Sequence, residues 1–130
     1  MSDFNSQHNR VVWVDVPVRD LNRAIAFYSA VLANNVSKVE MPGMEFAVLD
    51  HHDGNGGCLV PQAMGEDITS TGRVLVYFNA DGRIRAAVGL VEQNGGRIVE
   101  PVHSIGPHGY RAIIVDSEGN RIALHANSDQ

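Results

Sequence analysis

The stretch VVWVDVPVRDLNRAIAFYSAVL, residues 11–32, decides how this chain folds. Its beginning, Val11–Pro17, is apolar and β-branched, which predicts a strand. Asp20 can then cap a helix, because apolar side chains recur after it at helical spacing: Leu21, Ala24, Ile25, Tyr28 and Leu32. The apolar runs that come next predict three short strands, over Val36–Met41, Met44–Asp50 and Gly57–Pro61.

The second half of the chain repeats this order of elements. A strand is followed by a helix that Asp81 can cap and that Gly95-Gly96 can end, and three more strands come after it. The four strands are expected over Arg73–Ala80, Arg97–Pro101, Tyr110–Asp116 and Arg121–Ala126.

The two halves can be aligned residue by residue. Trp13 then matches Leu75, and Cys58 matches Ala123. An internal repeat of this kind predicts an α+β fold of two βαβββ repeats, about 11–61 and 73–126, that form a curved mixed sheet around a cleft. We expect a single domain over residues 10–126, between flexible tails at 1–9 and 127–130.

The composition excludes several classes of partner. The net charge is -5, and the one lysine and nine arginines are scattered, so no nucleic-acid surface is expected. No membrane span is expected either, because the apolar runs are far shorter than roughly 20 residues. Cys58 is the only cysteine and Met1–Asn9 has no apolar secretory segment, which favours a cytoplasmic protein without disulfides.

Two motifs in this order resemble a known family. They are VPVRDLNRAIAFY at residues 16–28 and DSEGNRIAL at residues 116–124, and the sequence NGG at 94–96 supports them. The chain is similar to the vicinal oxygen chelate superfamily, which includes glyoxalase I, extradiol dioxygenases and bleomycin-resistance proteins. Its first strand looks closest to a branch of uncharacterised proteins related to lactoylglutathione lyase. The resemblance implies a glyoxalase-like fold.

The resemblance also implies where a metal would be bound. In metal-dependent members each half contributes two ligands, typically His or Glu, one from its first strand and one from its last. Here these positions hold Trp13, Cys58, Leu75 and Ala123, of which only Cys58 could bind a metal. A catalytic site needs about three protein ligands, so we expect neither a metal nor another cofactor.

Strand alternation selects the candidate site residues. Trp13 and Asp15 share a face opposite the neighbouring valines, and an indole beside a carboxylate could orient a planar or cationic ligand. The predicted ligand-binding residues are Trp13, Asp15, Cys58, Leu75, Tyr77, Asn79, Ala123 and His125. Asp15, Tyr77 and His125 are the candidates for catalysis, and His125 suits acid/base work near neutral pH.

The other candidate groups have structural interpretations. Cys58 is expected to be a small buried residue, since a nucleophile would need an activating base. His51-His52 is expected in a solvated turn. His103 and His108 lie in the predicted loop Val102–Gly109, which could be part of a lid over the cleft or a plain connection.

Three functions remain open from the sequence. The first is a metal-independent protein that binds a small planar or cationic molecule in its cleft. The second is a lyase- or isomerase-type enzyme without metal, acting on a small carbonyl or aromatic substrate through Asp15, His125 or Tyr77. The third is a subunit that acts through protein contacts. A homodimer is expected, because open sheet edges in so small a domain invite pairing.

Overall fold

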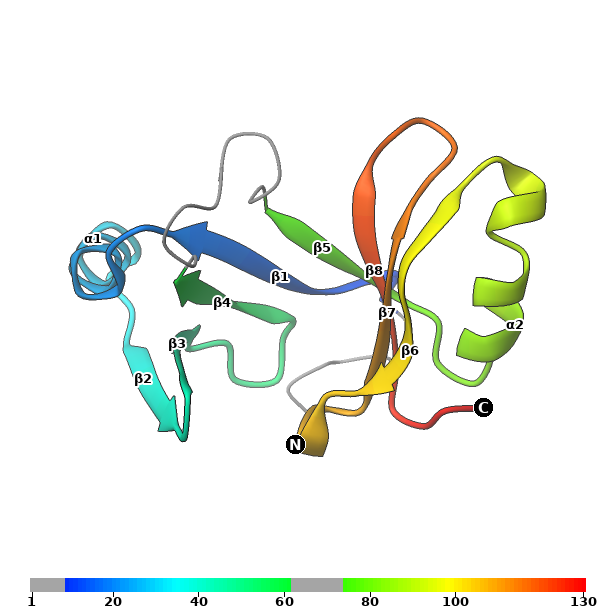
Figure 1. Ribbon diagram of the computed structural model, residues 1–130. Helices are drawn as coiled ribbons and strands as arrows, with labels where there is room; N and C mark the ends of the chain where they lie inside the picture. Colours follow the sequence, from blue (N-terminus) through cyan, green and yellow to red (C-terminus); the bar gives the residue numbers. More distant parts are fainter. Residues whose placement is uncertain (1–8, 62–73) are drawn as a thin grey trace. The chain divides into compact units, whose positions relative to one another are not determined.

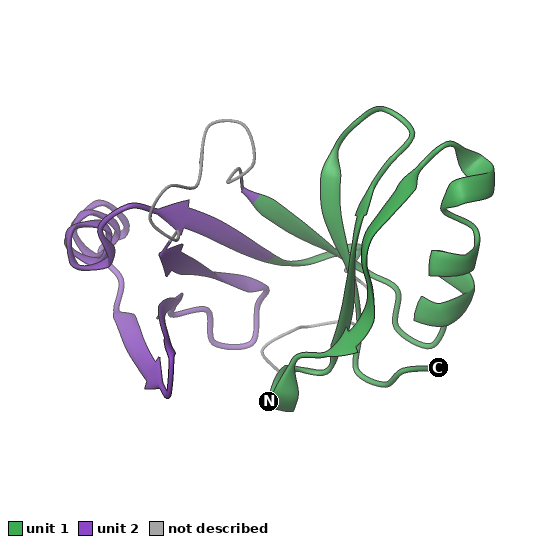
Figure 2. Ribbon diagram, viewed as in Figure 1, with its two compact units in different colours: residues 1–13, 75–130 green, residues 14–74 purple. Residues whose placement is uncertain are grey.

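The computed structural model describes residues 9–61 and 74–130 (Figure 1). The chain divides into two compact units (Figure 2). Unit 1 consists of residues 1–13 and 75–130, and unit 2 consists of residues 14–74. Apart from Asn9, the predicted N-terminal tail lies outside the described residues, and so does Arg73 of the predicted fifth strand.

The described part of unit 2 has one helix and three complete strands, together with most of the first strand. In chain order the elements are β1 (Val11–Val18), α1 (Leu21–Leu32), β2 (Val36–Met41), β3 (Met44–Leu49) and β4 (Gly56–Pro61). Hydrogen bonds connect the strands in the order β2-β3-β4-β1, and β3 is antiparallel to both β2 and β4. The predicted strands and helix of this half are therefore all present.

Helix α1 forms where the sequence predicts it. The Asp20 carboxylate accepts a hydrogen bond from the backbone N–H of Arg23 at 3.0 Å, so the predicted N-cap is confirmed. The helix ends at Ala33, which adopts the left-handed conformation with φ of 49°. One face of α1 packs on the sheet around a core of Val18, Leu21, Ala47 and Leu59.

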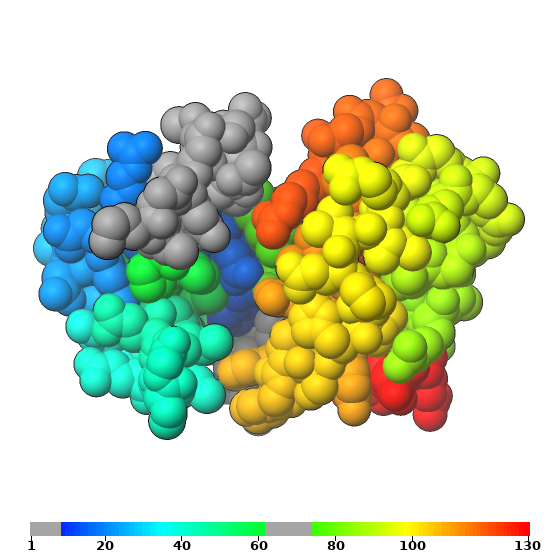
Figure 3. Space-filling model, in the orientation of Figure 1, coloured from blue at the N-terminus to red at the C-terminus, as the bar shows by residue number. Residues whose placement is uncertain are grey.

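Unit 1 repeats the same plan. Its elements are β5 (Leu75–Asn79), α2 (Ile84–Gly89), a 3-10 turn (Glu92–Asn94), β6 (Arg97–Ser104), a second 3-10 turn (Gly106–His108), β7 (Tyr110–Val115) and β8 (Arg121–Ala126). The strand order is β5-β8-β7-β6, with β5 parallel to β8 and the other pairs antiparallel. The first residues of β1, 11–13, also belong to this unit. Just before them, the Arg10 carbonyl accepts a hydrogen bond from the Asn79 N–H at 2.7 Å. Of the described strands, β7 alone pairs with β6, which lies at the surface of the unit (Figure 3).

The α+β fold with two βαβββ repeats is thus confirmed, with mixed strand pairing. The core of unit 1 consists of Ala80, Ile84 and Ala126, against which Val88 and Leu124 pack. The cleft expected between the repeats stays a prediction. Among the described residues, no helix has the length and hydropathy of a membrane span.

Three details of unit 1 differ from the sequence-based predictions. Asp81 does not cap α2: Gly82, with φ of 80°, makes a turn first, and the Asp81 carboxylate accepts from the Asn127 N–H at 2.8 Å. The helix ends at Gly89, before the 3-10 turn that leads to Gly95. Strand β6 continues to Ser104, so His103 lies in this strand and not in the predicted loop.

The second family motif forms the turn between β7 and β8. The Asp116 carboxylate accepts hydrogen bonds from the side-chain and backbone N–H groups of Asn120, at 3.0 and 2.8 Å, and from the Glu118 N–H at 2.9 Å. These bonds, led by the one from the Asn120 side chain, hold the pKa of Asp116 below its ordinary value. Gly119 supplies a φ of 90°. The motif is explained by this turn.

The C-terminal residues are tied to α2. The backbone N–H of Arg85 donates to the Gln130 carbonyl at 3.4 Å, and the Arg85 guanidinium lies 3.4 Å from the Asp129 carboxylate. These contacts attach the predicted tail 127–130 to the second helix.

Candidate functional site

A row of polar side chains crosses the sheet of unit 1. Asn79 on β5 pairs with His125 on β8, His125 pairs with Arg111 on β7, and Arg111 pairs with His103 on β6. Paired residues in neighbouring strands point to the same face of a sheet. The opposite face carries Leu124, which packs against the α2 core. The four polar residues therefore lie on the face away from the helix.

Hydrogen bonds connect three side chains of this face. Arg111 Nη1–H donates to the Tyr77 hydroxyl oxygen at 2.6 Å, and Arg111 Nε–H donates to His103 Nε2 at 3.1 Å. His103 Nδ1 lies 2.8 Å from the Pro101 carbonyl oxygen. Since a carbonyl only accepts, Nδ1 carries the ring proton, and Nε2 is the acceptor that Arg111 requires. Tyr77 is only 3% exposed, so its hydroxyl has little freedom to move. The Arg111 guanidinium is therefore held through Nη1 by Tyr77 and through Nε by His103.

Arg111 is partly buried, and the two described groups that accept its hydrogen bonds are neutral. Within residues 9–61 and 74–130, it forms no ion pair with a carboxylate. The acidic group beside the cluster is Glu100, whose Oε1 lies 3.6 Å from His103 Nε2. A partly desolvated guanidinium without a paired carboxylate favours an anionic partner.

His125 lies on this face but is fully buried. Its Nε2–H donates to the His108 carbonyl oxygen at 2.7 Å, and its ring centroid is 6.4 Å from that of Tyr77. Burial, the largest effect, lowers the pKa of His125 below its ordinary value, so the ring is neutral at neutral pH. Asn79 is also engaged: its side chain donates to the Asn9 carbonyl and accepts from the Asp81 N–H.

In unit 2, Asp15 and Cys58 occupy the positions that Tyr77 and Ala123 occupy in unit 1. The Cys58 thiol donates to Asp15 Oδ1 at 3.2 Å, and Cys58 is 7% exposed. In the internal repeat, this pair corresponds to Tyr77 and Ala123, which are neighbours on β5 and β8. The cysteine is buried, as predicted, and its thiol is hydrogen-bonded to a carboxylate.

The residues at the family's ligand positions do not fit a metal. Trp13 and Leu75 are each 6% exposed and Ala123 is fully buried, and none of these side chains has an oxygen, sulfur or imidazole nitrogen to donate to a metal. The fourth position holds Cys58, whose thiol donates a hydrogen bond to the Asp15 carboxylate. In the part of the chain that the structure describes, no three His, Cys, Asp or Glu side chains are grouped as a metal site would require.

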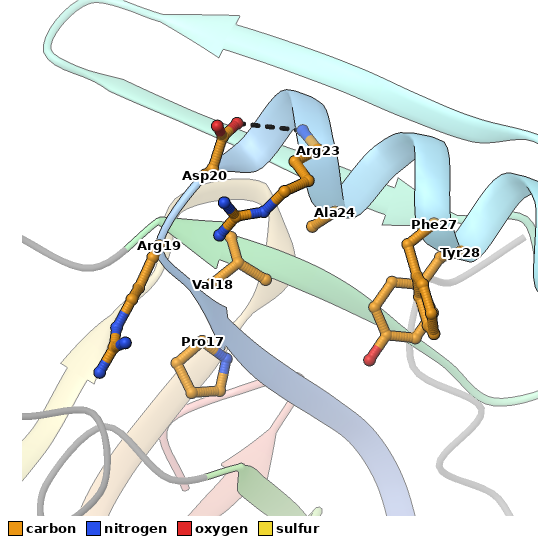
Figure 4. A pocket seen from close by; sticks show the side chains of 8 residues that line it. All are labelled: Pro17, Val18, Arg19, Asp20, Arg23, Ala24, Phe27 and Tyr28. Atoms are coloured by element: carbon orange, nitrogen blue, oxygen red, sulfur yellow. Dashed lines mark hydrogen bonds between the residues drawn. The ribbon is translucent and has the colours of Figure 1, made fainter.

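A cavity of about 370 Å³ lies in unit 2, where β1 ends and α1 begins (Figure 4). It is lined by Pro17, Val18, Arg19, Asp20, Arg23, Ala24, Phe27 and Tyr28. Phe27 is 58% exposed and meets Tyr28 edge to face, with ring centroids 5.2 Å apart. The sequence-based site includes none of these residues, and the cavity is open beside two exposed arginines.

Comparison with known proteins identifies the family. The sequence model of one protein family, the Glyoxalase/Bleomycin resistance protein/Dioxygenase superfamily, matches residues 10–124. The chain belongs to this superfamily, as the two motifs predicted. A search of curated proteins finds no match.

Solved structures of low sequence identity share the fold. A hypothetical protein from Bacillus halodurans C-125 has a TM-score of 0.70 at 14% identity, covering 95% of this chain and 98% of that one. An uncharacterised protein from Methanosarcina mazei has a TM-score of 0.62 at 19% identity, with coverages of 94% and 97%. Methylmalonyl-CoA epimerase from Streptomyces coelicolor has a TM-score of 0.64 at 18% identity, with coverages of 94% and 99%. These similarities establish the fold and no activity.

Proposed function

We propose that this chain binds a small molecule on the polar face of the unit 1 sheet, without the metal of its metal-dependent relatives. The observation that carries the proposal is the hydrogen-bonded chain of Tyr77, Arg111 and His103. These side chains come from three strands, so their relative positions are fixed by the sheet. Binding groups that are already ordered lose little conformational entropy when a ligand arrives.

The same geometry favours binding over catalysis. The enzymatic alternative relies on Asp15, His125 or Tyr77 as acid or base. His125 is fully buried and donates its Nε2–H to a backbone carbonyl, so its basic lone pair is on Nδ1, and that atom is buried away from a substrate. Tyr77 already accepts a hydrogen bond from Arg111, and Asp15 accepts one from Cys58. Each candidate thus has an evident structural role.

A screen of small molecules tests the proposal with two readouts. A ligand should raise the melting temperature, because it binds the folded state alone. It should also change the emission of Trp13, the only tryptophan, which is the last residue of the first segment of unit 1. Tyr77→Phe should then weaken binding by roughly 5- to 10-fold, since it removes the oxygen that holds Arg111 in place.

Tyr28→Phe is the matched control for this experiment. Tyr28 lines the cavity of unit 2, so the two variants lose the same hydroxyl at different places. The proposal predicts that only Tyr77→Phe changes the affinity. Loss of affinity with Tyr28→Phe alone would move the site to the cavity at α1, and a screen in which no compound stabilises the protein would contradict a binding function.

The proposal includes a homodimer in the cytoplasm. Among residues 9–61 and 74–130, β2 pairs only with β3 and β6 pairs only with β7, so each unit has in these residues an open strand edge of the kind that a second copy can cover. The single cysteine fits a reducing compartment. Light scattering should give about twice the chain mass of 14.1 kDa, and a value near one chain mass at micromolar concentration would contradict the dimer.

A further inference from the structure

We infer that the ligand of this face carries an oxyanion, most simply a carboxylate, and that Arg111 is the residue that binds it. The inference rests on the proposed function and names the chemical class of its ligand. It depends on three features of Arg111: its charge, its unused donors and its fixed position.

The charge of Arg111 is not neutralised by its own neighbours. The Tyr77 hydroxyl and His103 Nε2 are neutral acceptors. The Glu100 carboxylate lies 3.6 Å from His103 Nε2 and, in the described part of the chain, forms no ion pair with Arg111. Arg85, on α2 of the same unit, shows the contrasting case, because its guanidinium lies 3.4 Å from the Asp129 carboxylate. A carboxylate on the ligand would supply to Arg111 what Asp129 supplies to Arg85.

Arg111 also has donors left for a ligand. A guanidinium has five N–H groups, and the hydrogen bonds of Arg111 in the described part of the chain use one on Nε and one on Nη1. The Nη2 group and one further N–H on Nη1 remain. Two such donors match the two oxygens of a carboxylate, which is the bidentate geometry that arginine favours.

The position of Arg111 is fixed before a ligand arrives. Tyr77 and His103 are positioning residues, since they act on the ligand through Arg111. The Nδ1–H bond of His103 to the Pro101 carbonyl orients the ring so that Nε2 faces Arg111. The pairing of Arg111 with His103 on one side and His125 on the other sets its place in the sheet.

A cationic ligand is disfavoured on this face by the same reasoning, because it would meet Arg111 as a like charge. The sequence-based expectation of a cationic ligand depended on Asp15. That carboxylate lies in unit 2 and accepts a hydrogen bond from Cys58. The group that recognises charge on the polar face is therefore an arginine.

The test uses two carboxylates, benzoate and pyruvate, each beside its uncharged amide, benzamide and pyruvamide. The readout is the NMR signal of the Arg111 side-chain Nε–H in the full-length protein, followed during titration. At least one carboxylate should shift this signal saturably, while its amide leaves it in place. Arg111→Met should weaken binding of that carboxylate roughly 10- to 100-fold. Arg111→Lys should have an affinity between those of Arg111→Met and the unchanged protein, since it keeps the positive charge and loses the paired N–H donors of the guanidinium.

Arg97→Met is the matched control. Arg97 is an exposed arginine on β6 of the same unit, so this variant removes the same charge away from the cluster. It should bind the carboxylate as the unchanged protein does. Arg111→Lys retains a cation in the sheet, and its melting temperature without ligand separates a folding defect from a binding defect.

Two outcomes would overturn the inference. One is that neither carboxylate shifts the Arg111 signal, or that each amide shifts it equally. The other is that Arg97→Met weakens binding as much as Arg111→Met, which would indicate a general effect of net charge. If the screen above finds a neutral or cationic ligand that needs Tyr77 and is indifferent to Arg111→Met, the proposed function stands and this inference falls.

Discussion

Gly57→Ala should lower the free energy of unfolding by about 3 kcal/mol, because the new methyl group has no room. A Cβ at this position would lie 2.5 Å from Val14 Cγ1 and 2.6 Å from the Val14 backbone oxygen. The first contact could relax by a side-chain movement, but the second would force β4 away from β1. Thermal or urea denaturation of the two proteins measures the difference.

Gly54→Ala is the control for this prediction. Gly54 precedes the same strand, and its nearest neighbour to a new Cβ is the His51 carbonyl oxygen, at 3.4 Å. Its effect on the free energy of unfolding should stay within about 1 kcal/mol of zero, because the new methyl group has room there. Both substitutions restrict the unfolded chain equally, so the difference between them measures the steric clash at Gly57. Equal stability of Gly57→Ala and Gly54→Ala would show that β1 and β4 are not as close as described. The Cys58–Asp15 hydrogen bond depends on that closeness.

The order of elements could be predicted because local signals repeat along the chain. Asp20 as a cap and the helical spacing after it are contained within a dozen residues, and the same order in the second half supports them. Asp81 failed as a cap for an equally local reason. Gly82 follows it with φ of 80°, which turns the chain before the helix can begin.

The candidate site could be predicted only in part, because it depends on pairing between strands. Alternation along β5 and β8 placed Tyr77 and His125 on one face, and they do share it. Arg111 was not among the predicted site residues, and His103 was expected in the loop Val102–Gly109. The available signal was the turn at 116–120: Arg111 and His125 are equally distant from Glu118, so a tight hairpin pairs them. His103 had no such signal, because the register between β6 and β7 shifts twice.

Gly109→Ala should destabilise unit 1 by about 3 kcal/mol or more, since the substitution combines backbone strain with a steric clash. Gly109 has φ of 99° and ψ of -135°, a conformation that residues with a Cβ rarely adopt. A Cβ there would lie 2.5 Å from the Ala126 backbone oxygen and 3.2 Å from His125 Nε2. The substitution should therefore disturb the hydrogen bond from His125 to the His108 carbonyl as well as the backbone.

Gly106→Ala separates the two contributions. Gly106 lies in the same connection and also has a positive φ, of 70°, but a Cβ on it would meet nothing within 4 Å. Its cost should be the backbone strain alone, about 1–2 kcal/mol. The ring NMR signals of His125 should move with Gly109→Ala and stay in place with Gly106→Ala. If the two variants melted alike and neither moved these signals, His125 would not be packed against Gly109, and its burial would need another explanation.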